Sequence, residues 1–151
     1  MKLAALHPQL LGEWSGESQL WMNPSEPPLA SPSTMEVSPA ANGKFLTLRY
    51  TWAYEGKQQQ GLLLVGDGNK DAIATAAWVD SWHQSGKVMQ LVGAVEGETL
   101  SVTGHYPAPP GPDWGWRLSV HVSAAGELVL EMHNVPPGGE AELAVRAVYA
   151  R

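Results

Sequence analysis

Polar and apolar residues alternate along most of the chain, in segments of about 8 to 12 residues separated by turn signals. Leu118, Val120 and Val122 alternate with polar neighbours, and the same period of two recurs over residues 128–132 and 143–149. Successive side chains of a strand point to opposite faces of a sheet. The pattern therefore predicts a protein built mostly from half-buried β-strands.

Pairs containing glycine separate these segments, for example Asn42-Gly43, Glu55-Gly56 and Ser85-Gly86. Glycine readily adopts the positive φ that tight hairpin turns require. Connections this short cannot hold the crossovers of parallel strands, so we expect an antiparallel meander. The strands, about nine or ten of them, are predicted over residues 12–22, 32–38, 44–54, 58–66, 71–82, 87–96, 99–106, 114–123, 127–134 and 141–150.

A sheet of this size tends to curl, and closing it removes exposed edges. We therefore predict an all-β fold, a closed antiparallel up-and-down barrel over residues 1–151 as a single domain, with a sandwich as the alternative. Helix is expected only near residues 7–11, where Pro8 suits a first helical turn. The proline-rich segments 23–33 and 106–113 are predicted to be loops.

Composition narrows the choice of partners. The net charge is −6, and the nine Lys and Arg residues are scattered, which argues against a nucleic-acid partner. No apolar run approaches the roughly 20 residues of a membrane span, and residues 3–6 are too short for a secretory signal, so we expect a cytoplasmic protein. The chain has no cysteine, which excludes disulfides and thiolate zinc sites. Seven tryptophans must line a core, a cavity or an interface, such as that of a homodimer.

Three short motifs carry a resemblance to known barrels: Gly12-Glu13-Trp14-Ser15-Gly16, Trp78-Val79-Asp80-Ser81 and Tyr149-Ala150-Arg151. The first resembles the start of lipocalins and other calycin-type barrels. All three together resemble an uncharacterised bacterial family, a domain of unknown function with lipocalin-like barrels. The resemblance implies that Trp14 closes the barrel base and that an arginine near the last strand, Arg151 in preference to Arg146, lies across it.

The Gly-x-Trp-x-Gly start is also similar to that of nitrobindin-like haem barrels. In those proteins a third glycine follows and a histidine of the final strand ligates the haem. Here Ser18 takes the place of that glycine, and residues 141–151 contain no histidine. His133 of the preceding strand would have to substitute, so we expect no cofactor.

The densest group of candidate functional residues is Trp78-Val79-Asp80-Ser81-Trp82-His83. On a continuous strand Trp78, Asp80 and Trp82 would share one face, and Ser81 and His83 the other. A carboxyl group between two indoles can act as an acid or base if burial raises its pKa. Alternatively, Asp80 caps the following turn or accepts an indole N–H.

A second group depends on how the strands pair. Pairing around Ala125-Gly126 places His133 opposite Arg117, and pairing around the proline loop would bring His105 to face Arg117 as well. Such a row favours an anion. All three residues lie on the polar faces of their strands, so the alternative is that they face solvent. No carboxylate adjoins the histidines, and we expect no metal site.

Aromatic residues form a third group, with Tyr50, Trp52 and Tyr54 on one strand and Trp114 and Trp116 on another. Such stripes make a core or wall a cavity. The favoured function is a non-enzymatic barrel that binds a small apolar, amphipathic or anionic ligand. The alternatives are a hydrolase or isomerase that uses Asp80 or a barrel histidine, and a haem carrier.

Overall fold

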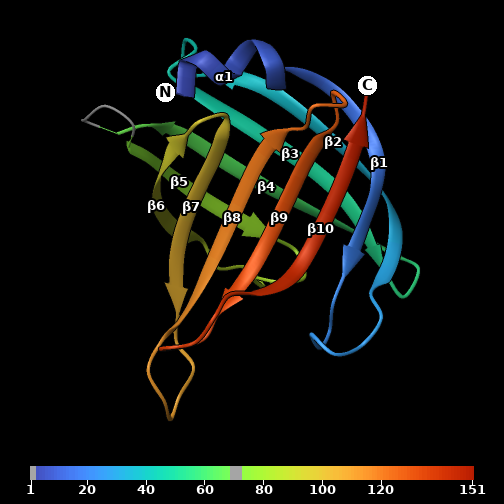
Figure 1. Cartoon of the computed structure of the whole chain (residues 1–151), viewed down its shortest axis with the longest axis vertical. Coiled ribbons are helices and arrows are strands. Elements are labelled where there is room, and N and C mark those ends of the chain that lie inside the picture. Colours follow the sequence, from blue (N-terminus) through green and yellow to red (C-terminus); the bar gives the residue numbers. More distant parts are fainter. Residues whose placement is uncertain (1–2, 69–72) are drawn as a thin grey trace.

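In the part of the chain that the structure describes, ten antiparallel strands close into a barrel, and one short helix lies across one of its ends (Figure 1). The structure is a computed structural model that describes residues 3–68 and 73–151. Each strand pairs with its neighbours in the sequence, and the last strand pairs with the first. The predicted all-β barrel is confirmed, and the sandwich alternative is wrong. The elements are α1 (Leu3–Leu10), β1 (Gly12–Leu20), β2 (Leu29–Ala40), β3 (Phe45–Tyr54), β4 (Lys57–Asp67), β5 (Ile73–Asp80), β6 (Met89–Glu96), β7 (Thr99–Tyr106), β8 (Trp114–Val122), β9 (Leu128–Val135) and β10 (Glu142–Ala150).

The prediction of a loop over residues 23–33 is wrong from Leu29 onward, where β2 begins. At Pro32 the strand pairs with β1, whereas its register with β3 starts only at Met35. Proline cannot donate a backbone hydrogen bond, and it is tolerated where one side of a strand carries no ladder. The start of the predicted strand 71–82 lies outside the described residues.

The helix α1 is longer than predicted, because it begins at Leu3 and holds Pro8 inside rather than in its first turn. Leu3, Leu6 and Leu10 are buried, and their spacing places them on one face of the helix. This face packs against the end of the barrel, which outweighs the cost of an internal proline. Within the described ranges, no helix has the length and apolarity to cross a membrane.

The barrel interior is filled by the protein's own side chains. Buried residues that are each at most 1 % exposed include Leu46 and Leu48 of β3, Val65 of β4 and Leu100 of β7. The residues that alternate with the buried ones along the strands face outward. The opposite end of the barrel from α1, which we call the mouth, holds the ends of β3 and β5 and the starts of β6 and β8 (Figure 1). Most of the tryptophans that the sequence singled out lie at the mouth.

Candidate functional site

At the helix end, Trp14 and Arg151 form the predicted stacked pair. The guanidinium carbon of Arg151 lies 4.1 Å from the centre of the Trp14 ring, a cation–π contact. The same guanidinium donates to the carbonyl oxygens of Gln9 and Leu11, each at 2.7 Å. Trp14 Nε1 donates to the carbonyl of Leu10 at 2.8 Å. These bonds pair carbonyls that the C-terminal end of α1 leaves without a helical partner.

The two glycines that flank Trp14 allow the helix end of the barrel to close. Gly12 has a φ of 119°, and a Cβ there would lie 2.8 Å from Arg151 Nη1. A Cβ at Gly16 would lie 1.9 Å from the carbonyl oxygen of Val148 on β10. The Gly-x-Trp-x-Gly motif therefore allows β1 to meet the last strand and the terminal arginine, and its role is architectural.

At the mouth, Asp80 ends β5 and fixes the turn that follows. Its carboxylate is 3 % exposed, and Oδ1 accepts the backbone N–H of Trp82 and of His83, each at 2.8 Å. Oδ2 accepts Tyr50 Oη at 2.6 Å and Trp52 Nε1 at 3.3 Å. Asp80 is thus both the turn cap and the indole acceptor of the second alternative, and four donors compensate its buried charge.

The phenol of Tyr50 links this carboxylate to a second indole. It donates to Asp80 and accepts Trp78 Nε1 at 2.9 Å. Burial, and then the charge of Asp80, raise the pKa of Tyr50 well above its usual value, so the phenol remains a donor. A Cβ at Gly61 would lie 2.1 Å from the Tyr50 ring, so this glycine makes room for it.

The prediction that His83 shares a face with Ser81, away from Asp80, is wrong. The strand ends at Asp80, and the turn over residues 81–86 carries the imidazole into the barrel mouth. Ser81 stays outside, where its hydroxyl donates to Gln59 Oε1 at 2.8 Å. Ser81 and His83 are therefore not arranged as a nucleophile and its base.

Four indoles surround the His83 ring. The ring centroids lie 4.7 to 5.8 Å away, with that of Trp82 the nearest; the four residues are Trp52, Trp78, Trp82 and Trp116. Burial lowers the pKa of His83 from 6.5, although the carboxylate of Asp80 opposes this effect. The imidazole is therefore neutral at pH 7.

His83 separates two cavities. The inner one has a volume of only about 10 Å³ and is lined by residues that include Tyr50, Trp52 and Tyr149. Burial raises the pKa of Tyr149 to about 12, and its hydroxyl lies 2.8 Å from Ser33 Oγ. The outer cavity, which we call the mouth pocket, measures about 390 Å³ and is lined by Trp78, His83, Gln84, Ser85, Lys87, Met89, Tyr106, Pro107, Trp116 and Asn134.

The mouth pocket has flat apolar walls and a few polar groups. The rings of Trp78 and Trp116 are nearly parallel, at 10°, with centroids 5.5 Å apart. Tyr106 Oη donates to Asn134 Oδ1 at 2.5 Å. Trp116 Nε1 and Gln84 Nε2 are buried and have no hydrogen-bond partner among the described residues. Such atoms are rare in folded proteins and need an explanation.

Sequence reasoning named Trp78, His83 and Trp116 of this pocket but missed Gln84, Lys87, Met89, Tyr106 and Asn134. Gln84 and Lys87 could have been suspected from their position beside the Ser85-Gly86 turn, whose residues have positive φ values of 48° and 86°. The other three are inward residues at strand ends, where an alternating pattern does not show which of them will reach the pocket.

Comparison with known proteins gives a family but no activity. The sequence profile of a family described as a protein of unknown function, DUF1579, matches residues 5–151. The chain belongs to the DUF1579 family. Among solved structures, Rv2717c from M. tuberculosis is similar, with a TM-score of 0.64 and 17 % identity over 100 % of this chain and 98 % of that one. At this identity the likeness shows the fold alone. No relative was found among curated proteins.

The second predicted group lies on the outside of this DUF1579 barrel. Arg117 pairs with His133, as expected, but His105 pairs with Gly115, so its expected pairing with Arg117 is wrong by two residues. Inward neighbours on β8 such as Leu118 are buried, which leaves Arg117 facing out.

Burial and the charge of Arg117 lower the pKa of His133, against the opposing effect of Glu131. From the outer face His133 cannot reach the lumen, so the residues present do not fit a haem held there in the manner of nitrobindin. Among the described residues there is also no group of three or more metal-ligating side chains.

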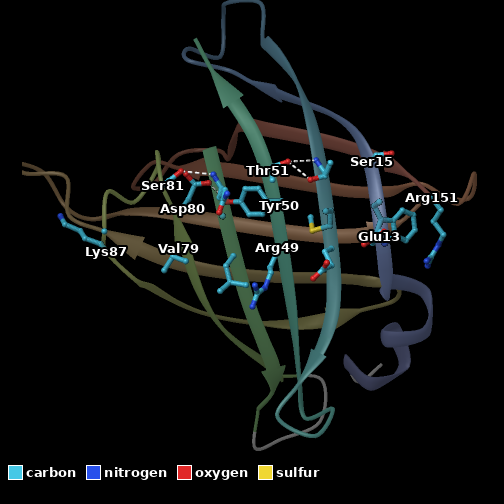
Figure 2. A pocket seen from close by; sticks show the side chains of 18 residues that line it. Glu13, Ser15, Arg49, Tyr50, Thr51, Val79, Asp80, Ser81, Lys87 and Arg151 are labelled. Carbon is cyan, nitrogen blue, oxygen red and sulfur yellow. Dashed lines mark hydrogen bonds between the residues drawn. The ribbon is translucent and has the colours of Figure 1, made fainter. Parts of the chain in front are cut away.

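An open depression of about 1180 Å³ covers the outer face of β1–β5 in the DUF1579 structure. Figure 2 shows its side chains, among them Glu13, Arg49 and Lys87. Hydroxyls in this depression pair with one another, as Thr34 and Thr51 do at 2.7 Å. It is broad and charged and lacks the flat apolar walls of the mouth pocket, so the mouth pocket is the better candidate site.

Proposed function

We propose that this DUF1579 protein binds a small amphipathic molecule in the mouth pocket and performs no covalent chemistry on it. The observation that carries the proposal is the 390 Å³ pocket between the indoles of Trp78 and Trp116 and the polar groups beside them. Small-molecule sites typically have volumes of about 300–1,000 Å³ and combine apolar walls with a few polar groups.

The position of the site follows from the packing of the barrel. An inner cavity of about 10 Å³ has room for no more than about one water molecule. The small volume of the inner cavity favours the mouth pocket over the lumen as the ligand site. A non-catalytic role is favoured because both oxygens of Asp80 already accept hydrogen bonds, and its phenol partner Tyr50 is held protonated.

Titration with the neutral fluorescent probe N-phenyl-1-naphthylamine tests this function. We expect a saturable increase in probe fluorescence. Trp116→Ala removes one wall and should weaken binding about tenfold, the equivalent of about 1.4 kcal/mol. Trp21→Ala, outside the pocket, serves as the matched control. No saturable signal, or an equal loss in both variants, would contradict binding in the mouth pocket.

A further inference from the structure

We infer that the ligand of the mouth pocket is a planar aromatic carboxylate, an inference that rests on the proposed function above. Two buried donors, Trp116 Nε1 and Gln84 Nε2, lack a partner among the described residues. An indole N–H can only donate, so its missing partner must be an acceptor. Trp116 is itself only 6 % exposed, and both residues line the pocket.

The turn holds the main chain of Gln84 but not its side-chain Nε2. Gln84 is held in the turn through its main chain, since its N–H donates to the Asp80 carbonyl and its carbonyl accepts the N–H of Lys87. Its side chain can therefore rotate without breaking either bond. An incoming oxygen atom would then give the Nε2 of Gln84 the acceptor that it lacks among the described residues.

The charges around the pocket also favour an anion. Lys87, an exposed residue that also borders the outer depression, lines the pocket, and the described lining of the pocket includes no Asp or Glu. Hydrogen bonds from neutral donors to an ionised acceptor are shorter and stronger than those to a neutral acceptor. Two N–H donors and one cation around a single pocket therefore favour a carboxylate over a neutral carbonyl.

The shape of the pocket favours a planar ring system. Trp78 and Trp116 stack on each other and together form an aromatic wall of the pocket, and Met89 adds a thioether that packs well against aromatic rings. Tyr106 is fixed by its hydrogen bond to Asn134. A rigid planar ring system fits such walls with less loss of conformational freedom than a flexible chain.

Isothermal titration calorimetry with 1-naphthoate and 1-naphthamide tests this assignment, because the two compounds share a ring system and differ in charge. We expect naphthoate to bind at least about tenfold more tightly. If naphthamide binds as tightly as naphthoate, the carboxylate assignment is overturned and the proposed function stands. If neither compound nor N-phenyl-1-naphthylamine binds, both are overturned.

Three variants test which side chains cause the preference for naphthoate over naphthamide. Gln84→Glu adds a negative charge, Lys87→Gln removes the positive one, and Trp116→Phe keeps an aromatic ring but removes the N–H. Each should reduce the naphthoate-to-naphthamide ratio about fivefold or more, while the controls Lys44→Gln and Trp21→Phe leave it unchanged. A ratio that survives in all three folded variants, checked by circular dichroism, would place the anion elsewhere and overturn the inference.

Discussion

One indole at each end of the barrel shows how differently the two ends are closed. At the helix end, Trp14 Nε1 donates to the carbonyl of Leu10, and Arg151 covers the ring. At the mouth, Trp116 is also buried, but its Nε1 has no partner among the described residues. A buried donor left unpaired costs about 1–3 kcal/mol. The indole at the mouth bears a cost that the indole at the helix end avoids.

The difference lies in what provides the closure. A helix and the end of the chain cover the first opening, through hydrogen bonds to main-chain carbonyls. A six-residue turn closes the second by inserting one side chain, His83, between four indoles. A ligand can displace a single side chain, or bind beside it, more easily than it can displace a packed helix. We therefore expect binding at the mouth.

The largest effect should come from Asp80→Ala, which removes the acceptor that holds the mouth together. Two side-chain donors and two backbone N–H groups would lose their partner in a buried site. We expect the free energy of unfolding to fall by about 3–5 kcal/mol, measured by urea denaturation. Asp80→Asn keeps one acceptor oxygen and should cost less. A loss below about 1 kcal/mol for Asp80→Ala would show that other contacts hold the turn.

Arg151→Ala tests the helix end in the same assay. It removes the contact with Trp14 and two hydrogen bonds, which together should cost about 1–2 kcal/mol. Arg146→Ala is the matched control, because Arg146 pairs with Glu131 at 2.7 Å in an ion pair whose side chains are 42 % and 24 % exposed. Such pairs contribute about 0–1 kcal/mol. Equal losses for the two arginines would mean that Arg151 does not close the barrel.

The alternating pattern predicted the barrel because each strand buries one face and exposes the other. A strand of this kind has apolar residues at every second position. Strand ends were less predictable, since they depend on partners distant in the sequence. Pro32 lies inside a strand because the neighbouring ladder starts later, and β5 ends at Asp80 because that carboxylate caps a turn.

The candidate site was predicted only in part for the same reason. Strand periodicity alone places Trp78 and Trp116 on inward faces. The inward rotation of His83 and the position of Gln84 depend on the geometry of the turn, which periodicity does not describe. The offset of His105 from Arg117 likewise depends on the loop between β7 and β8, whose length does not fix the register.

The smallest effect concerns pH and distinguishes the mouth from the outer face. Burial lowers the pKa of His83 in the folded state, so the unfolded chain binds a proton more readily below about pH 6.5. The free energy of unfolding should therefore decrease as the pH is lowered below that value. For one histidine the decrease is no more than about 1.4 kcal/mol per pH unit. His133 on the outer face contributes in the same direction.

Urea denaturation at pH 7.5 and 5.5 separates the two histidines. His83→Phe and His133→Gln should each flatten the pH dependence of the unfolding free energy, because each removes one proton from the difference between the unfolded and folded states. Only His83→Phe should also alter the affinity for N-phenyl-1-naphthylamine, since His83 lines the mouth pocket and His133 does not. If His133→Gln changed probe affinity to the same extent, the binding site would not be confined to the mouth, and the contrast between the two ends of the barrel would lose its functional meaning.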